Sequence, residues 1–151
     1  MSNTYLVWKT LHIVGVVLMV GNVTVTGAWA AILWRHRDRG SLRPMIRGIL
    51  WTDLIFTFGG GVLMTVAGIQ MIRLGEWPWR DTAWLMQGIV ALAVATLIWM
   101  LVLLPDQIRM DRCAAGDRER FGRLFRRWTV CGWVATVILY YGIWLMVTKR
   151  A

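Results

Sequence analysis

The sequence predicts an all-α protein, a bundle of four transmembrane helices with both chain termini outside. Three observations support this prediction. First, 58% of the 151 residues are hydrophobic. Second, the chain contains four long apolar runs, each close to the ~20 residues that cross a bilayer as a helix. Third, the basic residues collect in two of the three connections between these runs, as the positive-inside rule expects.

We expect a single integral membrane domain over residues 1–151, because four spans leave little chain for a soluble module. Only helices or closed barrels satisfy their backbone in lipid. Barrel strands are short and alternate between apolar and polar residues, so long continuous apolar runs indicate helices. The expected spans are Tyr5–Trp34, Gly48–Ile72, Thr82–Leu104 and Trp128–Val147.

The first span has no Asp, Glu, Lys or Arg between Thr10 and Trp34. Polar side chains are costly in lipid, so a stripe that collects them should face the protein interior. Steps of three and four residues keep side chains on one helix face. One such stripe comprises Tyr5, Trp8, His12, Gly15, Met19, Asn22, Thr26 and Trp29.

The second span carries a triplet of glycines, Gly59 to Gly61. Small residues let helix backbones approach closely, so the triplet predicts tight helix packing. A kink, or space for a flat ligand, is the alternative. The third span also carries small residues, and Gln87 is its strongly polar member.

The connection before the fourth span runs from Pro105 to Arg127 and contains seven Arg. Its apolar residues follow helical spacing, which indicates a short amphipathic helix on the anionic inner leaflet. An ordinary basic stop before the fourth span is the alternative. The apolar residues are Phe121, Leu124, Phe125 and Trp128.

The 17 Lys and Arg divide 12 to 5 between the two sides of the predicted bundle. The first and third connections carry the larger share, which places them in the cytoplasm. We therefore expect a multi-pass protein of the bacterial inner membrane, in contact with the lipid bilayer. We expect no nucleic-acid partner, because the basic residues behind the net charge of +9 lie beside the spans. A homodimer or a larger membrane complex is compatible with this pattern.

His12 is the one histidine inside a predicted span, and an ionisable residue there is a functional hypothesis by default. A neutral imidazole can ligate haem iron. It can also bind copper together with thioether sulfur from Met71, Met86 or Met146. The third alternative is an interhelical hydrogen bond without any cofactor.

Two residues near His12 complete the candidate cofactor site. Lys9 lies one turn earlier and is a candidate partner for a haem propionate, or else an anchor that snorkels to the outer surface. Met19 lies on the same stripe as His12. A six-coordinate haem requires a His/Met pair, or His12 from each of two protomers. The other histidine, His36, sits among arginines in the first connection and is expected to be solvated.

Two further intramembrane polar residues are candidate sites. Asp53 is a candidate for proton relay or for a counter-ion role; alternatively it lies at the interface and pairs with Arg47 or Arg127. Asn22 is expected to bridge helices. The sequence shows no Ser/His/Asp arrangement, no paired carboxylates inside a span and no HExxH motif, so it does not decide whether the protein is an enzyme.

Several short segments together resemble a bacterial family of predicted integral membrane proteins of unknown function. They are Lys9-Thr10-Leu11-His12, Gly21-Asn22, Thr26-Gly27-Ala28-Trp29, Thr52-Asp53, Ala67-Gly68, Arg127-Trp128 and Met146-Val147-Thr148-Lys149. The family is more remotely similar to the membrane domain of copper-resistance D proteins and to haem-binding, oxygen-independent protoporphyrinogen oxidase. That remote similarity implies that His12 is a cofactor ligand or a group beside a bound quinone.

We therefore expect a small membrane protein that binds haem b, or copper, through His12 in a redox-associated role. The alternative is a non-enzymatic accessory or transport-related subunit without a cofactor. In that case the polar stripe mediates helix packing and partner contacts.

Overall fold

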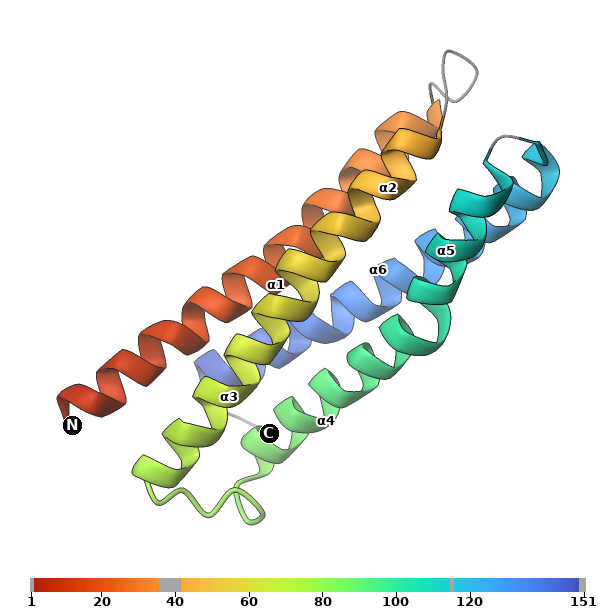
Figure 1. Cartoon of the computed structure of the whole chain (residues 1–151). Helices are drawn as coiled ribbons and strands as arrows, with labels where there is room; N and C mark the ends of the chain where they lie inside the picture. The colour runs from red at the N-terminus through yellow and green to blue at the C-terminus, as the bar shows by residue number, and fades with distance from the viewer. Residues whose placement is uncertain (1, 36–41, 115, 150–151) are drawn as a thin grey trace.

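The computed structural model describes residues 2–35, 42–114 and 116–149, and these residues are helical with short turns. Four helices are long and apolar enough to cross a membrane, as predicted. The first span is α1 (Asn3–Arg35) and the fourth is α6 (Arg118–Thr148). They run side by side with the other two spans in an elongated bundle (Figure 1).

The second span is built from three consecutive helical segments. They are α2 (Arg43–Thr52), the π-helical segment η1 (Asp53–Phe58) and α3 (Gly59–Leu74). A π-helix has wider turns than an α-helix and is often found at functional sites. The glycine triplet therefore begins α3 directly after the widened turns.

The third span has the same construction. It consists of α4 (Ala83–Ile98), the π-helical segment η2 (Trp99–Leu103) and α5 (Leu104–Cys113). Pro105 is the second residue of α5, two positions after the end of η2, and does not end the helix. A proline cannot donate a backbone hydrogen bond and needs space near the preceding turn, and the widened turns of η2 lie where that space is needed.

The helices are longer at the basic end than the spans expected from sequence. The third reaches Cys113 and the fourth begins at Arg118, so only four residues, 114–117, separate the two helices. The segment around Phe121 is helical, as predicted, but its expected position on the leaflet surface is wrong. Phe121 and Phe125 are buried against α2 and α5, because α6 continues unbroken out of the membrane.

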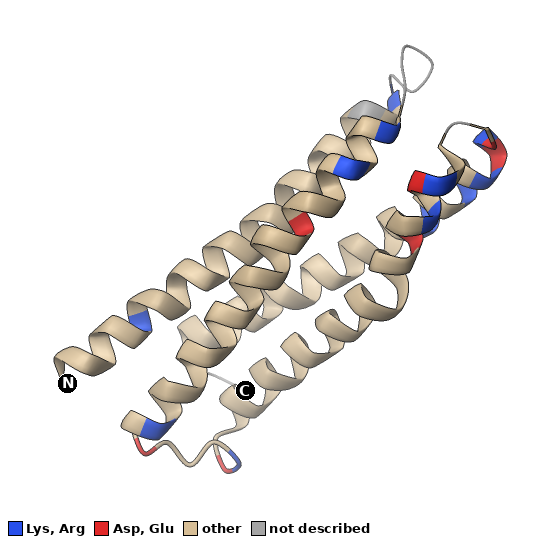
Figure 2. Cartoon of the chain, viewed as in Figure 1, with Lys and Arg blue, Asp and Glu red and all other residues tan. Residues whose placement is uncertain are grey.

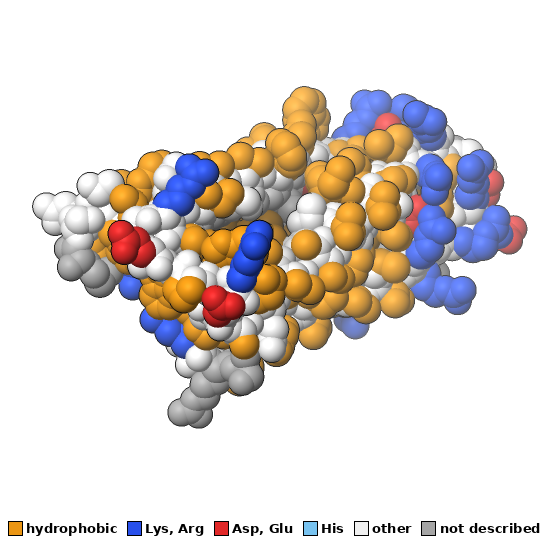
Figure 3. Space-filling view, turned by 90° about the horizontal axis from the view of Figure 1, so that it is seen from below, with side chains coloured by type: hydrophobic (Ala, Val, Ile, Leu, Met, Phe, Trp, Pro, Cys, Tyr) orange, Lys and Arg blue, Asp and Glu red, His pale blue; other side chains and the backbone are white. Residues whose placement is uncertain are grey.

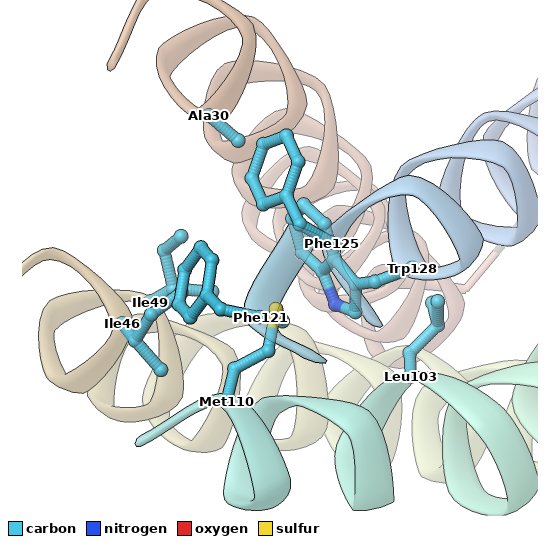
Figure 4. Close-up of a cluster of buried hydrophobic side chains, with 8 residues drawn as sticks. All are labelled: Ala30, Ile46, Ile49, Leu103, Met110, Phe121, Phe125 and Trp128. Atoms are coloured by element: carbon cyan, nitrogen blue, oxygen red, sulfur yellow. The ribbon is translucent and has the colours of Figure 1, made fainter. Parts of the chain in front are cut away.

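A hydrophobic core occupies the basic end of the bundle and joins all four spans (Figure 4). Trp34 of α1 stacks on Phe125 of α6, with ring centroids 4.4 Å apart. Stacked aromatic pairs add stability beyond their buried area. The buried members of this core are Ala30, Ile46, Ile49, Leu103, Met110, Phe121, Phe125 and Trp128.

The first and second spans pack backbone against backbone at two glycines. A Cβ atom added to Gly15 would lie 2.6 Å from the backbone nitrogen of Met64. One added to Gly60 would lie 2.9 Å from the carbonyl oxygen of Gly15. The prediction that the glycine triplet serves close packing is confirmed at its middle residue.

Lys and Arg gather at one end of the bundle, around the start of α2, the end of α5 and the start of α6 (Figure 2). The opposite end carries few charges. This distribution agrees with the positive-inside rule for an end that faces the cytoplasm. Residues 36–41 of the first connection, among them His36, lie outside the described residues.

Candidate intramembrane site

A cluster of four polar side chains links the first three spans. The side-chain nitrogen of Asn22 donates to Asp53 Oδ1 at 2.8 Å and to Thr57 Oγ1 at 2.9 Å. Thr57 also donates to Asp53 Oδ1, at 3.2 Å. Gln107 Nε2 of α5 donates to Asp53 Oδ2 at 2.6 Å. The prediction that Asn22 bridges helices is confirmed, and its partner is Asp53.

Asp53 is buried, with only 4% of its surface exposed. The alternative that it pairs with Arg47 or Arg127 is wrong. Arg47 contacts Asp111 at 3.2 Å, and Arg127 pairs with Asp106. Both aspartates lie on α5, which extends beyond the expected end of the third span and brings carboxylates to the arginines.

Asp106 and Gln107 are functional candidates that the sequence reasoning missed. Both are fully buried. Arg127 holds Asp106 through two nitrogens, with Arg127 Nε 2.7 Å from Asp106 Oδ2. Their positions after Pro105 placed them in a predicted connection. The available signal was helical spacing, because Leu103, Gln107 and Met110 recur at steps of four and three.

A cavity of about 360 Å³ lies beside this polar cluster, between the four spans. Its wall is mostly apolar, with a few polar side chains. Ligand pockets typically have volumes of about 300–1,000 Å³ and this combination of a mostly apolar wall and few polar groups. The wall residues that carry a side-chain hydrogen-bonding group are Thr26, Asp53, Thr57, Thr65, Thr96, Trp99, Trp128, Thr129, Trp133 and Thr136.

Two adjacent residues of α6 that line the cavity hold buried polar atoms without a hydrogen-bond partner in the described parts of the chain. These atoms are Trp128 Nε1 and Thr129 Oγ1. The side chain of Trp99 faces the Asp53 carboxyl group instead. A buried polar group that lacks a partner costs about 1–3 kcal/mol. The two atoms have almost no accessible surface, so a small movement of these side chains would offer them to a bound molecule.

Both π-helical segments border the cavity. Asp53, Thr57 and Phe58 come from η1, and Trp99 comes from η2. Phe58 and Trp99 stack across the two spans, with ring centroids 6.5 Å apart. The π-helical segments of the second and third spans therefore meet beside the polar cluster.

His12 lies elsewhere, in the interface between α1 and α3. Its Nδ1 is 2.8 Å from the carbonyl oxygen of Met64. A carbonyl can only accept, so Nδ1 is the protonated nitrogen and Nε2 carries the lone pair. The ring lies over Gly68, where an added Cβ would come within 3.2 Å of Nδ1. The imidazole is half-buried.

The other predicted cofactor residues are not gathered around His12. Lys9 is exposed one turn earlier on α1. Met19 is buried against Met64 and lies roughly 10 Å from His12 by helical rise. Met146 packs on Gly88, between α4 and α6. Within the described ranges, no group of three or more His, Cys, Asp or Glu is placed to hold a metal ion.

Asn22 and Asp53 therefore form one site, and His12 belongs to another. Ten residues of α1 separate His12 from Asn22, which is roughly 15 Å along the helix. The two sites therefore lie at different levels along the bundle.

Comparison with known proteins identifies one family. The family described as "Predicted integral membrane protein (DUF2269)" matches residues 6–150. No curated protein and no solved structure matches the chain. The match covers nearly all of the four spans, including His12, the polar cluster and the cavity. The chain therefore belongs to this family of integral membrane proteins of unknown function.

Proposed function

We propose that the protein binds a small lipid-soluble molecule in the cavity between its four spans. The cavity itself is the observation that supports this function. It measures about 360 Å³, is mostly apolar, and is lined on α6 by Trp128 and Thr129, whose polar atoms lack a partner among the described residues. Such a role belongs to the accessory or transport-related class. The proposed setting is the bacterial inner membrane, with the arginine-rich end of the bundle in the cytoplasm and both termini outside.

The chemistry of the wall selects the kind of ligand. Trp128 offers an indole N–H group, which only donates, and Thr129 offers a hydroxyl. The matching polar group is a carbonyl oxygen. A ring or chain of hydrocarbon would fill the remaining apolar wall. We infer a lipid-soluble ketone or quinone whose carbonyl end lies near Trp128 and Thr129.

The cavity is open toward the bilayer between the second and third spans. Val62 and Val66 of α3 and Met100 of η2 line it and are exposed. Along this side α3 and α4 make little contact with each other, whereas α1 packs extensively on α3 and α4 on α6. A ligand dissolved in the membrane would therefore enter sideways, with its hydrocarbon tail left in lipid.

Filling the cavity should abolish binding. Gly132 lines the cavity, and an added Cβ there would lie 4.0 Å from the nearest atom, a methyl of Leu103. Gly132→Leu is expected to fold and to occupy the space of the ligand. Binding of a decyl-substituted benzoquinone, measured by saturable quenching of tryptophan fluorescence in detergent, should weaken at least about tenfold.

The matched control is Gly21→Leu, the same change on the outer face of α1. Gly21 has nothing within 4 Å of an added Cβ and does not line the cavity. It should leave quenching unchanged. Equal quenching in both variants, or no saturable quenching of the unmodified protein, would overturn the proposed function.

A second candidate function is the binding of haem b through His12, and one observation favours it. The hydrogen bond to Met64 fixes the tautomer that leaves Nε2 free. Metal-ligating histidines usually donate their other ring N–H in this way, often to a backbone carbonyl. Bound haem would supply one-electron redox chemistry. Lys9 is the proposed propionate partner, and copper is the alternative metal.

The structure restricts how haem could be ligated. Met19 is buried two turns away and does not fit as the second axial ligand of an iron at His12. Met71, on the helix that His12 contacts, remains the thioether candidate for copper. A bis-histidine haem would take His12 from each of two copies, for which the half-buried imidazole provides access. The haem proposal is therefore also a proposal of a homodimer.

His12→Ala should abolish the Soret band of protein reconstituted with haem, while circular dichroism shows that the helices remain. His36→Ala changes the other histidine of the chain and should leave the band intact. Protein that takes up neither haem nor copper after reconstitution would refute this candidate. His12 would then serve as an interhelical hydrogen-bond donor.

A further inference from the structure

The outer face of α6 carries a second, chemically different hollow at the basic end of the bundle. Four arginines form its walls: Arg120, Arg123, Arg126 and Arg127. Its remaining lining is apolar, from Leu124, Val130 and Cys131. We name these seven residues the arginine groove. It faces away from the core, which α6 contacts through Phe121, Phe125 and Trp128.

The four arginines are not equally neutralised. Arg127 pairs with the buried Asp106, and Arg123 pairs with Glu119. Arg120 and Arg126 have no carboxylate partner in the parts of the chain that the structure describes. The groove therefore holds two uncompensated guanidinium groups, which form paired hydrogen bonds with phosphate oxygens especially well.

The groove lies at the depth of lipid headgroups. The apolar run Trp128–Val147 has the length of the hydrocarbon core, about 30 Å at 1.5 Å per residue. Arg127 and Arg126 come directly before this run, and Arg120 lies roughly 10 Å further out along α6. Figure 3 shows the blue Lys and Arg side chains gathered beyond the orange hydrophobic middle of the molecule.

An apolar track continues from the groove into the membrane. Val130, Val134 and Val137 follow one another at steps of four and three, on the same side of α6 as the arginines. All three are exposed. An arginine cluster above an exposed aliphatic track matches a molecule with a phosphate at one end and an acyl chain at the other.

We propose that the arginine groove binds one anionic phospholipid of the cytoplasmic leaflet. Its phosphate lies between Arg120 and Arg126, and one acyl chain follows the valine track. Two uncompensated cations favour a lipid with net negative charge, such as phosphatidylglycerol, over a zwitterionic one. This site is independent of the cavity, because none of its residues lines that cavity.

The test is titration of the detergent-purified full chain with phosphatidylglycerol, with bound lipids counted by native mass spectrometry. Arg120→Gln with Arg126→Gln should weaken binding of the first lipid about thirtyfold, since each basic residue near anionic lipid contributes roughly a factor of five. Phosphatidylcholine should bind the unmodified protein at least about tenfold more weakly. Excess inorganic phosphate should leave the bound lipid in place.

The matched control also removes two positive charges, from arginines that lie outside the groove but at the same end of the bundle. Arg35→Gln with Arg112→Gln does this, since both residues are exposed. It should change binding less than about twofold. Equal loss in both double variants, equal binding of the two lipids, or displacement of lipid by inorganic phosphate would each overturn the proposal.

Discussion

Replacing Gly60 by leucine should abolish the folded bundle. An added Cβ at this position would lie 2.9 Å from two backbone atoms of α1, the carbonyl oxygen of Gly15 and the amide nitrogen of Met19. Backbone cannot move aside as a flexible side chain can, so the first and second spans must separate. We expect a loss of at least about 3 kcal/mol in the free energy of unfolding.

The measurement is unfolding by SDS in mixed micelles, followed by circular dichroism. Gly59→Leu provides the control on the adjacent residue, because nothing lies within 4 Å of an added Cβ there. It should unfold at nearly the same SDS fraction as the unmodified protein. If the two leucine variants were equally stable, the close contact between α1 and α3 would not hold the bundle together.

The number of spans was predictable because each apolar run is long and carries at most one charged residue. The role of the glycine triplet was also predictable, since small residues have a known use in membrane helices. Which glycine makes the contact was not. Gly59, Gly60 and Gly61 point in three directions, and only the position of α1 distinguishes Gly60 from its neighbours.

The polar cluster could be predicted only in part, because its residues were recognisable and their contacts were not. Asn22 and Asp53 were each recognised as intramembrane polar residues, but the pair that they form depends on the register of two helices. Gln107 was missed because Pro105 was read as the end of the span. The widened turns of η2 allow the helix to continue through the proline. No local sequence pattern predicts these π-helical turns.

The cavity could not be predicted from sequence at all. Trp128 was read as a residue of the headgroup belt, where tryptophan is common. In the structure its ring is buried in the core and its N–H lacks a partner among the described residues. A cavity is the space between the helices that their side chains leave empty. Its position and volume depend on the packing of all four spans together.

Asn22→Leu should weaken the bundle by about 2 kcal/mol. Leucine has nearly the same shape as asparagine but removes both hydrogen bonds, to Asp53 and to Thr57. A neutral bond between membrane helices contributes roughly 1 kcal/mol, and a bond to a carboxylate contributes more. Thr65→Val is the control. The Thr65 hydroxyl bonds within its own helix, to the Gly61 carbonyl, and its removal should cost less than about 0.5 kcal/mol.

The cost of Asn22→Leu should depend on what occupies position 53. With Asp53 present, the substitution leaves a buried carboxylate with one donor fewer in surroundings where water cannot replace it. In an Asp53→Asn background the group left behind is a neutral amide, whose desolvation costs less. A double-mutant cycle should therefore give a coupling of about 1 kcal/mol between the two positions. If Asn22→Leu cost the same in both backgrounds, Asn22 would stabilise the bundle by packing alone, and Asp53 would have to draw its support from Gln107 and Thr57.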